Sequence, residues 1–118
     1  MHGLAEFLTT LSEEQLSVFQ YLDQQLLAAG LGRKIRFRVP FYDYHKWLCY
    51  LNPLKNGNFE LCFLQGVLLH KTNPVLDVKK RKMVAGYEIM VQADMDIDLI
   101  LEIVNNAMAL QSIENISL

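Results

Sequence analysis

Between residues 33 and 40 the chain reads Arg33-Lys34-Ile35-Arg36-Phe37-Arg38-Val39-Pro40. Apolar and cationic side chains alternate along this segment, so Ile35, Phe37 and Val39 point to one side and the cations to the other. A period of two is typical of a strand with one packed face and one wet face. Because Pro40 has no N–H to donate to a sheet, we expect the strand to end or bulge there.

Helical periodicity lies on both sides of this alternating segment. Residues 12–15 (Ser-Glu-Glu-Gln) form a capping box, in which the Ser12 hydroxyl accepts from the backbone of Gln15 and the Gln15 side chain reaches back. We therefore predict a helix near residues 13–29. A second helix near residues 96–111 is predicted from an apolar stripe at helical spacing. That stripe comprises Ile97, Ile100, Leu101, Val104 and Met108.

Three further strands are predicted between the helices, at residues 46–51, 58–64 and 82–92. Because runs of strands flanked by helices favour segregated layers, we predict an α+β fold. Its two layers are an antiparallel sheet of four or more strands and the N- and C-terminal helices packed on one face. The predicted core comprises Phe19, Leu26, Phe37, Trp47, Phe63, Ile100, Leu101 and Val104.

Charge and hydropathy exclude some classes of partner. The formal net charge of −2 disfavours general nucleic-acid binding, which needs a basic surface. The run Lys79-Lys80-Arg81-Lys82 is basic but short, and a solvated turn or an edge-strand guard explains it more simply than a phosphate site does. No apolar run approaches the roughly 20 residues that cross a bilayer, so no membrane partner is expected.

The cysteines and the N-terminus indicate a cytoplasmic protein. Cys49 and Cys62 each lie in an apolar run, without a Cys-x-x-Cys or Cys/His metal spacing. Two free, buried thiols fit a reducing compartment. Met1-His2-Gly3 begins without a basic or long apolar segment, so no signal peptide is expected.

Three phrases carry a family resemblance. They are Val39-Pro40-Phe41-Tyr42 followed by Tyr44, then Leu48-Cys49-Tyr50-Leu51-Asn52-Pro53, and later Phe63-Leu64-Gln65-Gly66. With them the chain resembles, over about residues 12 to 110, the small bacterial family called domain-of-unknown-function 1801, or YdhG-like. The resemblance implies one YdhG-like α+β domain over residues 1–118, with a frataxin-like fold. It also implies, as an alternative function, an iron-binding chaperone of the frataxin-like type.

The residues do not predict an enzyme. None of the histidines (His2, His45 and His70) shares a helical face with a second ligand or has a readable general-base partner. No serine sits in a nucleophile elbow, and there is no phosphate-cradling glycine loop. We therefore predict no catalytic residues and no cofactor.

The acidic residues gather at the predicted helix starts, where carboxylates stabilise the macrodipole. Asp94, Asp96 and Asp98 are two residues apart, so on a helix they point away from one another and do not readily chelate one ion. The cations Arg36 and Arg38 on the first strand repel a hard cation where frataxins carry an acidic ridge. We therefore predict no intrinsic metal site.

The best candidates for a ligand surface are the aromatic and cationic residues around Pro40. Tyrosine rings suit a flat apolar group and arginines suit an anion. We expect Arg36, Arg38, Tyr42 and Tyr44 to line the main concavity, with His45 at its rim. Alternatively, Trp47, Cys49 and Leu51 only pack a buried strand face. The prediction is a non-enzymatic binding module for a small anionic or aromatic ligand or a protein partner, as a monomer or homodimer.

Overall fold

The computed structural model describes residues 3–116, and the side chains of residues 3–113. Helices and strands follow one another in a fixed order along the chain. They are α1 (Leu4–Thr9), α2 (Glu13–Ala28), β1 (Gly32–Arg36), β2 (Val39–Asp43), β3 (Trp47–Pro53), β4 (Phe59–Phe63), α3 (Gly66–His70), β5 (Ala85–Ile89) and α4 (Ile97–Ile116).

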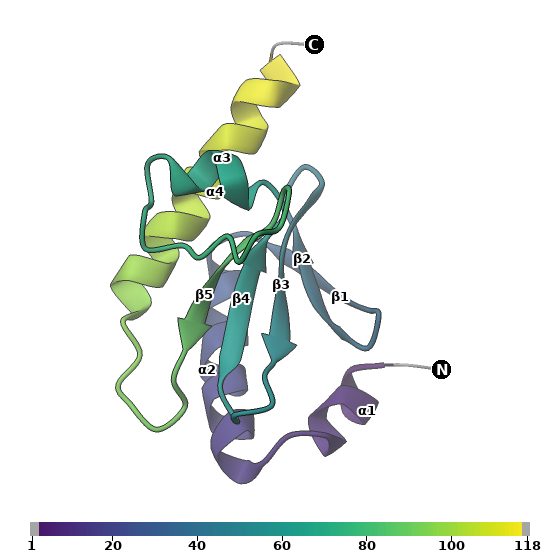
Figure 1. Cartoon of the computed structure of the whole chain (residues 1–118). Coiled ribbons are helices and arrows are strands. Elements are labelled where there is room, and N and C mark those ends of the chain that lie inside the picture. The colour runs from purple at the N-terminus through teal and green to yellow at the C-terminus, as the bar shows by residue number, and fades with distance from the viewer. Residues whose placement is uncertain (1–2, 117–118) are drawn as a thin grey trace.

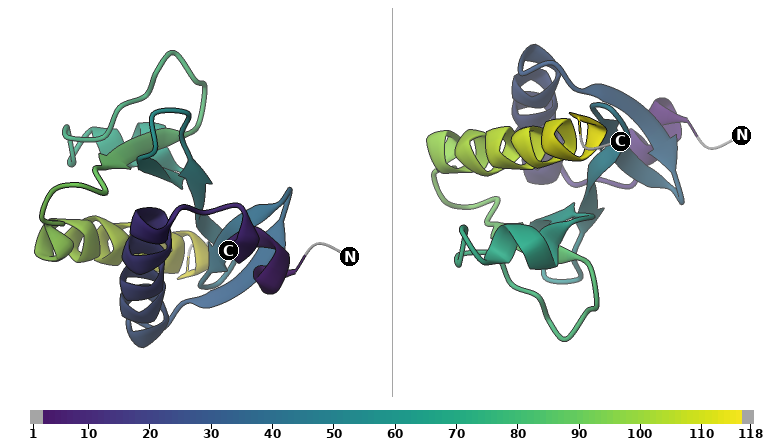
Figure 2. Two further views of the ribbon diagram at one scale, coloured as in Figure 1. Left: turned by 90° about the horizontal axis from the view of Figure 1, so that it is seen from below. Right: turned by 90° about the horizontal axis from the view of Figure 1, so that it is seen from above.

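The strands form one antiparallel sheet in the order β1-β2-β3-β4-β5. Helices α2 and α4 lie against the same face of this sheet and cross each other at a steep angle (Figures 1 and 2). The predicted α+β class, with N- and C-terminal helices on an antiparallel sheet, is therefore confirmed. We call the sheet surface that faces away from α2 and α4 the open face.

Both helix starts are capped by the residue types that the sequence offers. The Ser12 hydroxyl accepts from the Gln15 backbone N–H at 3.1 Å, and the Ser12 N–H donates to the Gln15 side chain at 3.0 Å. Asp96 accepts from the backbone N–H of Leu99 at 3.1 Å, in front of α4. These caps explain why the predicted helix starts agree closely with the structure.

The core lies between the sheet and the two long helices. Five of its predicted members are buried there: Phe19, Leu26, Phe63, Ile100 and Val104. The prediction is wrong for Phe37, which is 81% exposed, and Leu101 is only half-buried. Helix α4 is rotated relative to the predicted stripe, so that its buried residues are Ile100, Ile103, Val104, Ala107 and Gln111.

The predicted strand over residues 33–39 is wrong in its C-terminal half. β1 ends at Arg36, residues 37 and 38 form a two-residue turn, and β2 begins at Val39. Pro40 lies inside β2, opposite Ile35, instead of ending a strand. Alternation continues through a tight hairpin turn, so the apolar pattern alone did not reveal the reversal.

Pro40 still marks an end, because pairing between β2 and β3 stops one residue after it, at Phe41 opposite Tyr50. Proline cannot donate a hydrogen bond to the neighbouring strand. The tip of the β1–β2 hairpin consequently diverges from β3 (Figure 1).

A bulge at the start of β3 reorients Trp47. Tyr42 pairs with Cys49 and Asp43 with Trp47, so Leu48 has no partner of its own on β2. One extra residue moves Trp47 to the opposite face from that predicted by strict alternation with Cys49. The expected packing of Trp47 beside Cys49 and Leu51 is therefore wrong.

Candidate functional site

The five residues predicted to bind a ligand lie in three different places. Tyr42 faces the helices, Tyr44 and His45 lie at the β2–β3 turn against α4, and Arg36 and Arg38 lie at the hairpin tip. The structure therefore does not bring all five to one concavity.

Tyr42 is the clearest correction, because it is fully buried. Its hydroxyl donates to Asp23 of α2 at 2.8 Å, and Arg33 forms an ion pair with the same carboxylate. Burial, followed by the charge of Asp23, raises the pKa of Tyr42 far above its usual value. The residue fastens β2 to α2 and has no surface for a ligand.

Tyr44 and His45 lie at the opposite end of β2 from the arginines. The Gln111 side chain of α4 accepts from the backbone N–H of His45 at 3.1 Å. The His45 ring lies 4.3 Å from that of Tyr44 and 3.5 Å from the Ser112 hydroxyl. These contacts attach the β2–β3 turn to α4.

Arg36 organises a different group of aromatic side chains on the open face. Its guanidinium carbon lies 4.6 Å from the ring centroid of Trp47, 5.2 Å from that of Phe41 and 5.4 Å from that of Phe37. Phe41 also stacks on Tyr50, with centroids 4.9 Å apart. We call this group, with the neighbouring cation, the aromatic–basic patch; it comprises Lys34, Arg36, Phe37, Phe41, Trp47 and Tyr50.

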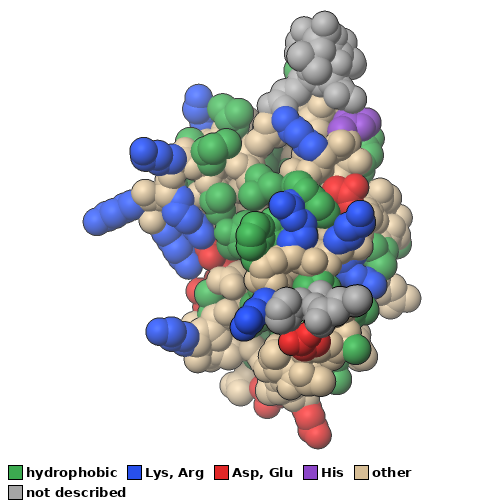
Figure 3. Space-filling view, turned by 90° about the vertical axis from the view of Figure 1, so that its right-hand side faces the viewer, with side chains coloured by type: hydrophobic (Ala, Val, Ile, Leu, Met, Phe, Trp, Pro, Cys, Tyr) green, Lys and Arg blue, Asp and Glu red, His purple; other side chains and the backbone are tan. Residues whose placement is uncertain are grey.

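The patch is accessible as well as aromatic. On the side of the molecule that carries β1, Lys and Arg side chains lie around a central group of hydrophobic side chains (Figure 3). Phe37 is the most exposed ring of the patch, while Trp47 and Tyr50 are half-buried and Phe41 is buried. Burial raises the pKa of Tyr50 to about 12, so its phenol is neutral at physiological pH.

The turn that presents Phe37 is unusual in its residues. Phe37 and Arg38 have φ angles of 52° and 67°, the signature of a type I′ turn, which asparagine and glycine normally occupy. Positive φ is unfavourable for a bulky side chain. A residue pair that costs stability here is a reason to seek a function at the tip.

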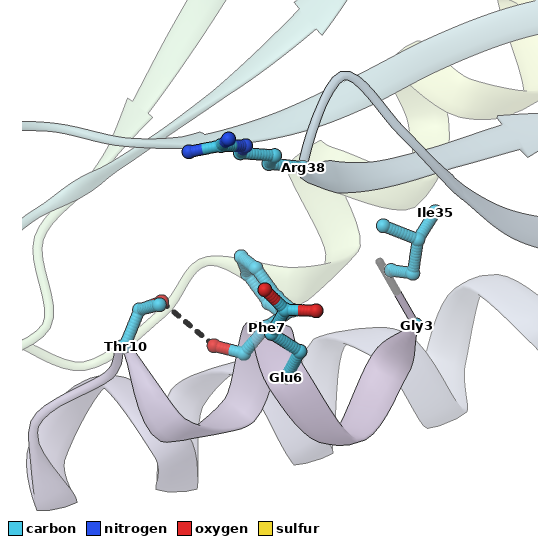
Figure 4. Close-up of a pocket in the computed structure, with 6 residues that line it drawn as sticks. All are labelled: Gly3, Glu6, Phe7, Thr10, Ile35 and Arg38. Carbon is cyan, nitrogen blue, oxygen red and sulfur yellow. Dashed lines mark hydrogen bonds between the residues drawn. The ribbon is translucent and has the colours of Figure 1, made fainter. Parts of the chain in front are cut away.

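A small cleft lies on the other side of the same tip, between the hairpin and α1. Its lining residues are Gly3, Glu6, Phe7, Thr10, Ile35 and Arg38, and its volume is about 100 Å³. Figure 4 shows Arg38 of the hairpin across the cleft from Glu6 and Phe7 of α1. We call it the α1 cleft. Arg38 is the one residue of the five predicted that lines it.

Two residues of the basic run at 79–82 belong to an ion-pair cluster on the open face. Arg81 donates to the two carboxylate oxygens of Glu60 at 3.2 and 2.9 Å, and Lys79 lies 3.2 Å from the same carboxylate. Burial alone would raise the pKa of Glu60, but hydrogen bonds from Arg81, Cys62 and Lys79 outweigh it and lower the pKa. A charged residue inside the apolar run of β4 was the sequence signal for this cluster.

The two thiols have no reactive setting. Burial raises the pKa of Cys49 far above its usual value, and burial with the nearby Glu60 charge raises that of Cys62 to about 12. The Cys62 thiol donates to Glu60 at 3.2 Å. Both groups are therefore protonated at neutral pH and weak as nucleophiles.

Two larger hollows offer less specific chemistry. One of about 300 Å³ is lined mainly by polar residues near the α2 start, where Gln92 already donates to Glu14 at 3.1 Å. Another of about 260 Å³, beside α3, is lined mostly by apolar residues such as Leu68 and Met83. Neither includes a residue of the aromatic–basic patch.

Neither a metal-ligand cluster nor a membrane-spanning helix is found among the described residues. Within residues 3–113, no three His, Cys, Asp or Glu side chains lie close enough together to hold one metal ion. Among the helices of residues 3–116, none combines the length and apolar content that spanning a bilayer requires.

Comparisons with known proteins leave the family open. No family model, no curated protein and no solved structure matches this chain. The resemblance to the YdhG-like family therefore stays a prediction from the phrases quoted above.

Proposed function

We propose that this protein is a small cytoplasmic binding module, not an enzyme, and that the aromatic–basic patch is its recognition surface. The observation that carries the proposal is the guanidinium of Arg36 held over the rings of Phe37, Phe41 and Trp47. A guanidinium held against aromatic rings by cation–π attraction can still direct N–H donors to a carboxylate, sulfonate or phosphate group.

The chemistry of the patch favours a partner with an anionic group and an apolar surface. Phe37 is 81% exposed and offers an apolar ring to cover, while Lys34 on the same face adds a second positive charge. Burying aromatic surface supplies affinity and the cations supply orientation.

Trp47 makes the proposal directly testable, because it is the one tryptophan of the chain and belongs to the patch. The probe is 1-naphthalenesulfonate, a flat aromatic anion, compared with uncharged 1-naphthalenemethanol. We expect the anion to change Trp47 fluorescence saturably and to bind more tightly than the alcohol. Amide NMR shifts should localise both to β1–β3.

The variants Arg36→Gln and Phe37→Ser should each weaken binding of the anion by about tenfold, the effect of one lost charge-assisted hydrogen bond or one lost buried ring contact. Tyr44→Ser is the matched aromatic control at the far end of β2, and should leave binding unchanged. Equal affinity for all three variants, or shifts confined to another surface, would overturn the proposal.

A further inference from the structure

The two edge strands of the sheet differ in whether their outer backbone groups are paired. At the β5 edge, Asp77 exchanges two backbone hydrogen bonds with Gly86, of 2.8 and 2.9 Å, on the side away from β4. At the β1 edge, no strand or bridge lies beyond β1 in the part of the chain that the structure describes. β1 therefore has one paired side and one unpaired side.

The hairpin geometry identifies the backbone groups on the unpaired side. Arg36 and Val39 flank a two-residue turn, and a pair in that position exchanges two hydrogen bonds. Bonded and non-bonded pairs alternate along an antiparallel ladder. The backbone N–H and C=O groups of Arg33 and Ile35 therefore point away from β2, where an added strand would meet them.

The side chains along β1 alternate between cationic and apolar, and between the two faces of the sheet. Lys34 and Arg36 both project from the open face of this edge strand; Lys34 is exposed, and the Arg36 guanidinium lies over Phe41 of β2. Ile35 between them projects to the other face, where it lines the α1 cleft with Phe7 (Figure 4). A strand laid against β1 would meet a cation, an apolar contact and a second cation at three successive positions.

We propose that β1 binds an extended peptide segment of a partner protein as a sixth strand, with carboxylates on either side of an apolar residue. The carboxylates pair with Lys34 and Arg36, and the apolar side chain packs on Ile35 and enters the α1 cleft. Main-chain bonds to Arg33 and Ile35 supply affinity, and the side-chain pattern supplies specificity. The inference rests on the proposed function, since Lys34 and Arg36 belong to the aromatic–basic patch.

Charge also selects against a second copy of this chain at the same edge. Pairing of β1 with β1 would bring Lys34 and Arg36 close to the same cations of the other copy. Like charges facing each other across a ladder are destabilising, and exposed edges often carry cations for that reason. An acidic strand turns this repulsion into attraction.

The test uses a capped peptide of the sequence Gly-Glu-Val-Glu-Val-Glu-Gly and amide exchange measured by NMR. We expect the peptide to slow exchange of the Arg33 and Ile35 amides. Two further peptides carry backbone N-methyl groups on alternate residues, one set for each parity. One set blocks the peptide N–H groups that face β1. Because each lost backbone hydrogen bond lowers the affinity about twofold to tenfold, and several are lost, this peptide should bind tenfold or more weakly than the parent peptide. The other set should bind nearly as well as the parent.

Charge variants give a second readout. Losing one exposed charge pair weakens binding by up to about fivefold. Lys34→Glu should therefore weaken peptide binding by about twofold to fivefold. Lys55→Glu, in the exposed β3–β4 loop, is the matched control and should bind the peptide like the parent protein.

Several results would overturn the inference. If the peptide fails to bind at millimolar concentration, or if both methylated peptides bind equally, β1 does not take a sixth strand. A change in Trp47 fluorescence without protection of the Arg33 and Ile35 amides would support the proposed function and remove the edge-strand inference. Protection of those amides without peptide, with dimers in sedimentation velocity, would assign the edge to a second copy.

Discussion

Each edge of the sheet, at β1 and at β5, lies beside its own basic segment, and the cations of the two segments make opposite kinds of contact. At β5, Arg81 and Lys79 turn inward onto the buried carboxylate of Glu60, and Asp77 completes the ladder at Gly86. At β1, Lys34 and Arg36 project from a strand whose outer side has no partner among the described residues. The same residue types therefore fasten the chain at one edge and remain available at the other.

The two basic segments even share a backbone conformation. Lys79 and Lys80 have φ angles of 49° and 61°, and the backbone N–H of Arg81 donates to the carbonyl of Val78 at 2.9 Å. Two successive residues with positive φ also form the Phe37–Arg38 turn. A positive φ at four bulky residues is unfavourable. At Lys79 an ion pair to Glu60 accompanies that conformation, whereas Phe37 is left 81% exposed. The two turns therefore share a backbone conformation but differ in whether a neighbouring carboxylate accompanies it.

The largest effect is expected in the core that both edges share. Ile103→Ala should lower the free energy of unfolding by about 2–5 kcal/mol, because Ile103 is completely buried and its truncation leaves a cavity. Leu101→Ala, on the half-buried flank of the same helix, should cost less than about 2 kcal/mol. Urea denaturation at constant m-value measures both, and equal losses would contradict the orientation of α4.

The closed edge should depend on Glu60. Glu60→Gln removes the negative charge and one of the two acceptor oxygens that Arg81 and Lys79 contact, so we expect a loss of about 1.5–3 kcal/mol, the range for hydrogen bonds to charged groups. Glu88→Gln, opposite Glu60 on β5 but exposed, is the matched control and should change stability by less than about 0.5 kcal/mol. Amide exchange should also quicken at Gly86 in Glu60→Gln, because the Asp77 bridge loses its support.

The same carboxylate predicts a pH dependence. The folded-state pKa of Glu60 is lowered, so its contribution is complete above the unfolded value of about 4.3 and is lost as the pH falls through the folded pKa. The stability difference between the parent protein and Glu60→Gln should therefore be constant at neutral pH and shrink in acid. Denaturation series at pH 7, 5 and 3 would measure it, and a difference that grows in acid would have the wrong sign.

The smallest effect is expected at the open edge, and it is a gain. The double variant Phe37→Asn with Arg38→Gly supplies the preferred type I′ residues and should raise stability by about 1 kcal/mol. It should also weaken binding of 1-naphthalenesulfonate by about tenfold, as expected for Phe37→Ser. Lys80→Gly is the control in the turn at residues 79 and 80, before β5. It should raise stability slightly and leave binding of 1-naphthalenesulfonate unchanged. A double variant that gains no stability would mean that the β1 turn is not strained.

Sequence reasoning succeeded where the signal was local. The capping box at Ser12 and the helical stripes placed α2 and α4 closely, and the run of strands between the two helices predicted an antiparallel sheet. It failed at the hairpin because no Gly or Asn marks the turn at residues 37 and 38. It failed for Trp47 because the bulge at Leu48 leaves no compositional trace.

The candidate site was predicted only in part. Arg36 was chosen for its charge and lies in the aromatic–basic patch, but Tyr42 was chosen for its ring and proved to be buried against Asp23. Phe37, expected in the core, is the most exposed ring of the patch. A one-residue change of register exchanges the two faces of a strand, so residue type alone did not separate packing from recognition.

The sequence by itself determined the α+β class, the two long helices and the location of the aromatic and cationic residues, because capping and hydrophobic period act over a few neighbouring residues. Only the tertiary structure decided which charges are satisfied. Arg81 finds Glu60 across 21 positions of sequence, and Arg36 meets Trp47 through a bulge and a hairpin turn. Such contacts depend on strand register and on the order of strands in the sheet, which arise from the packing of the whole domain.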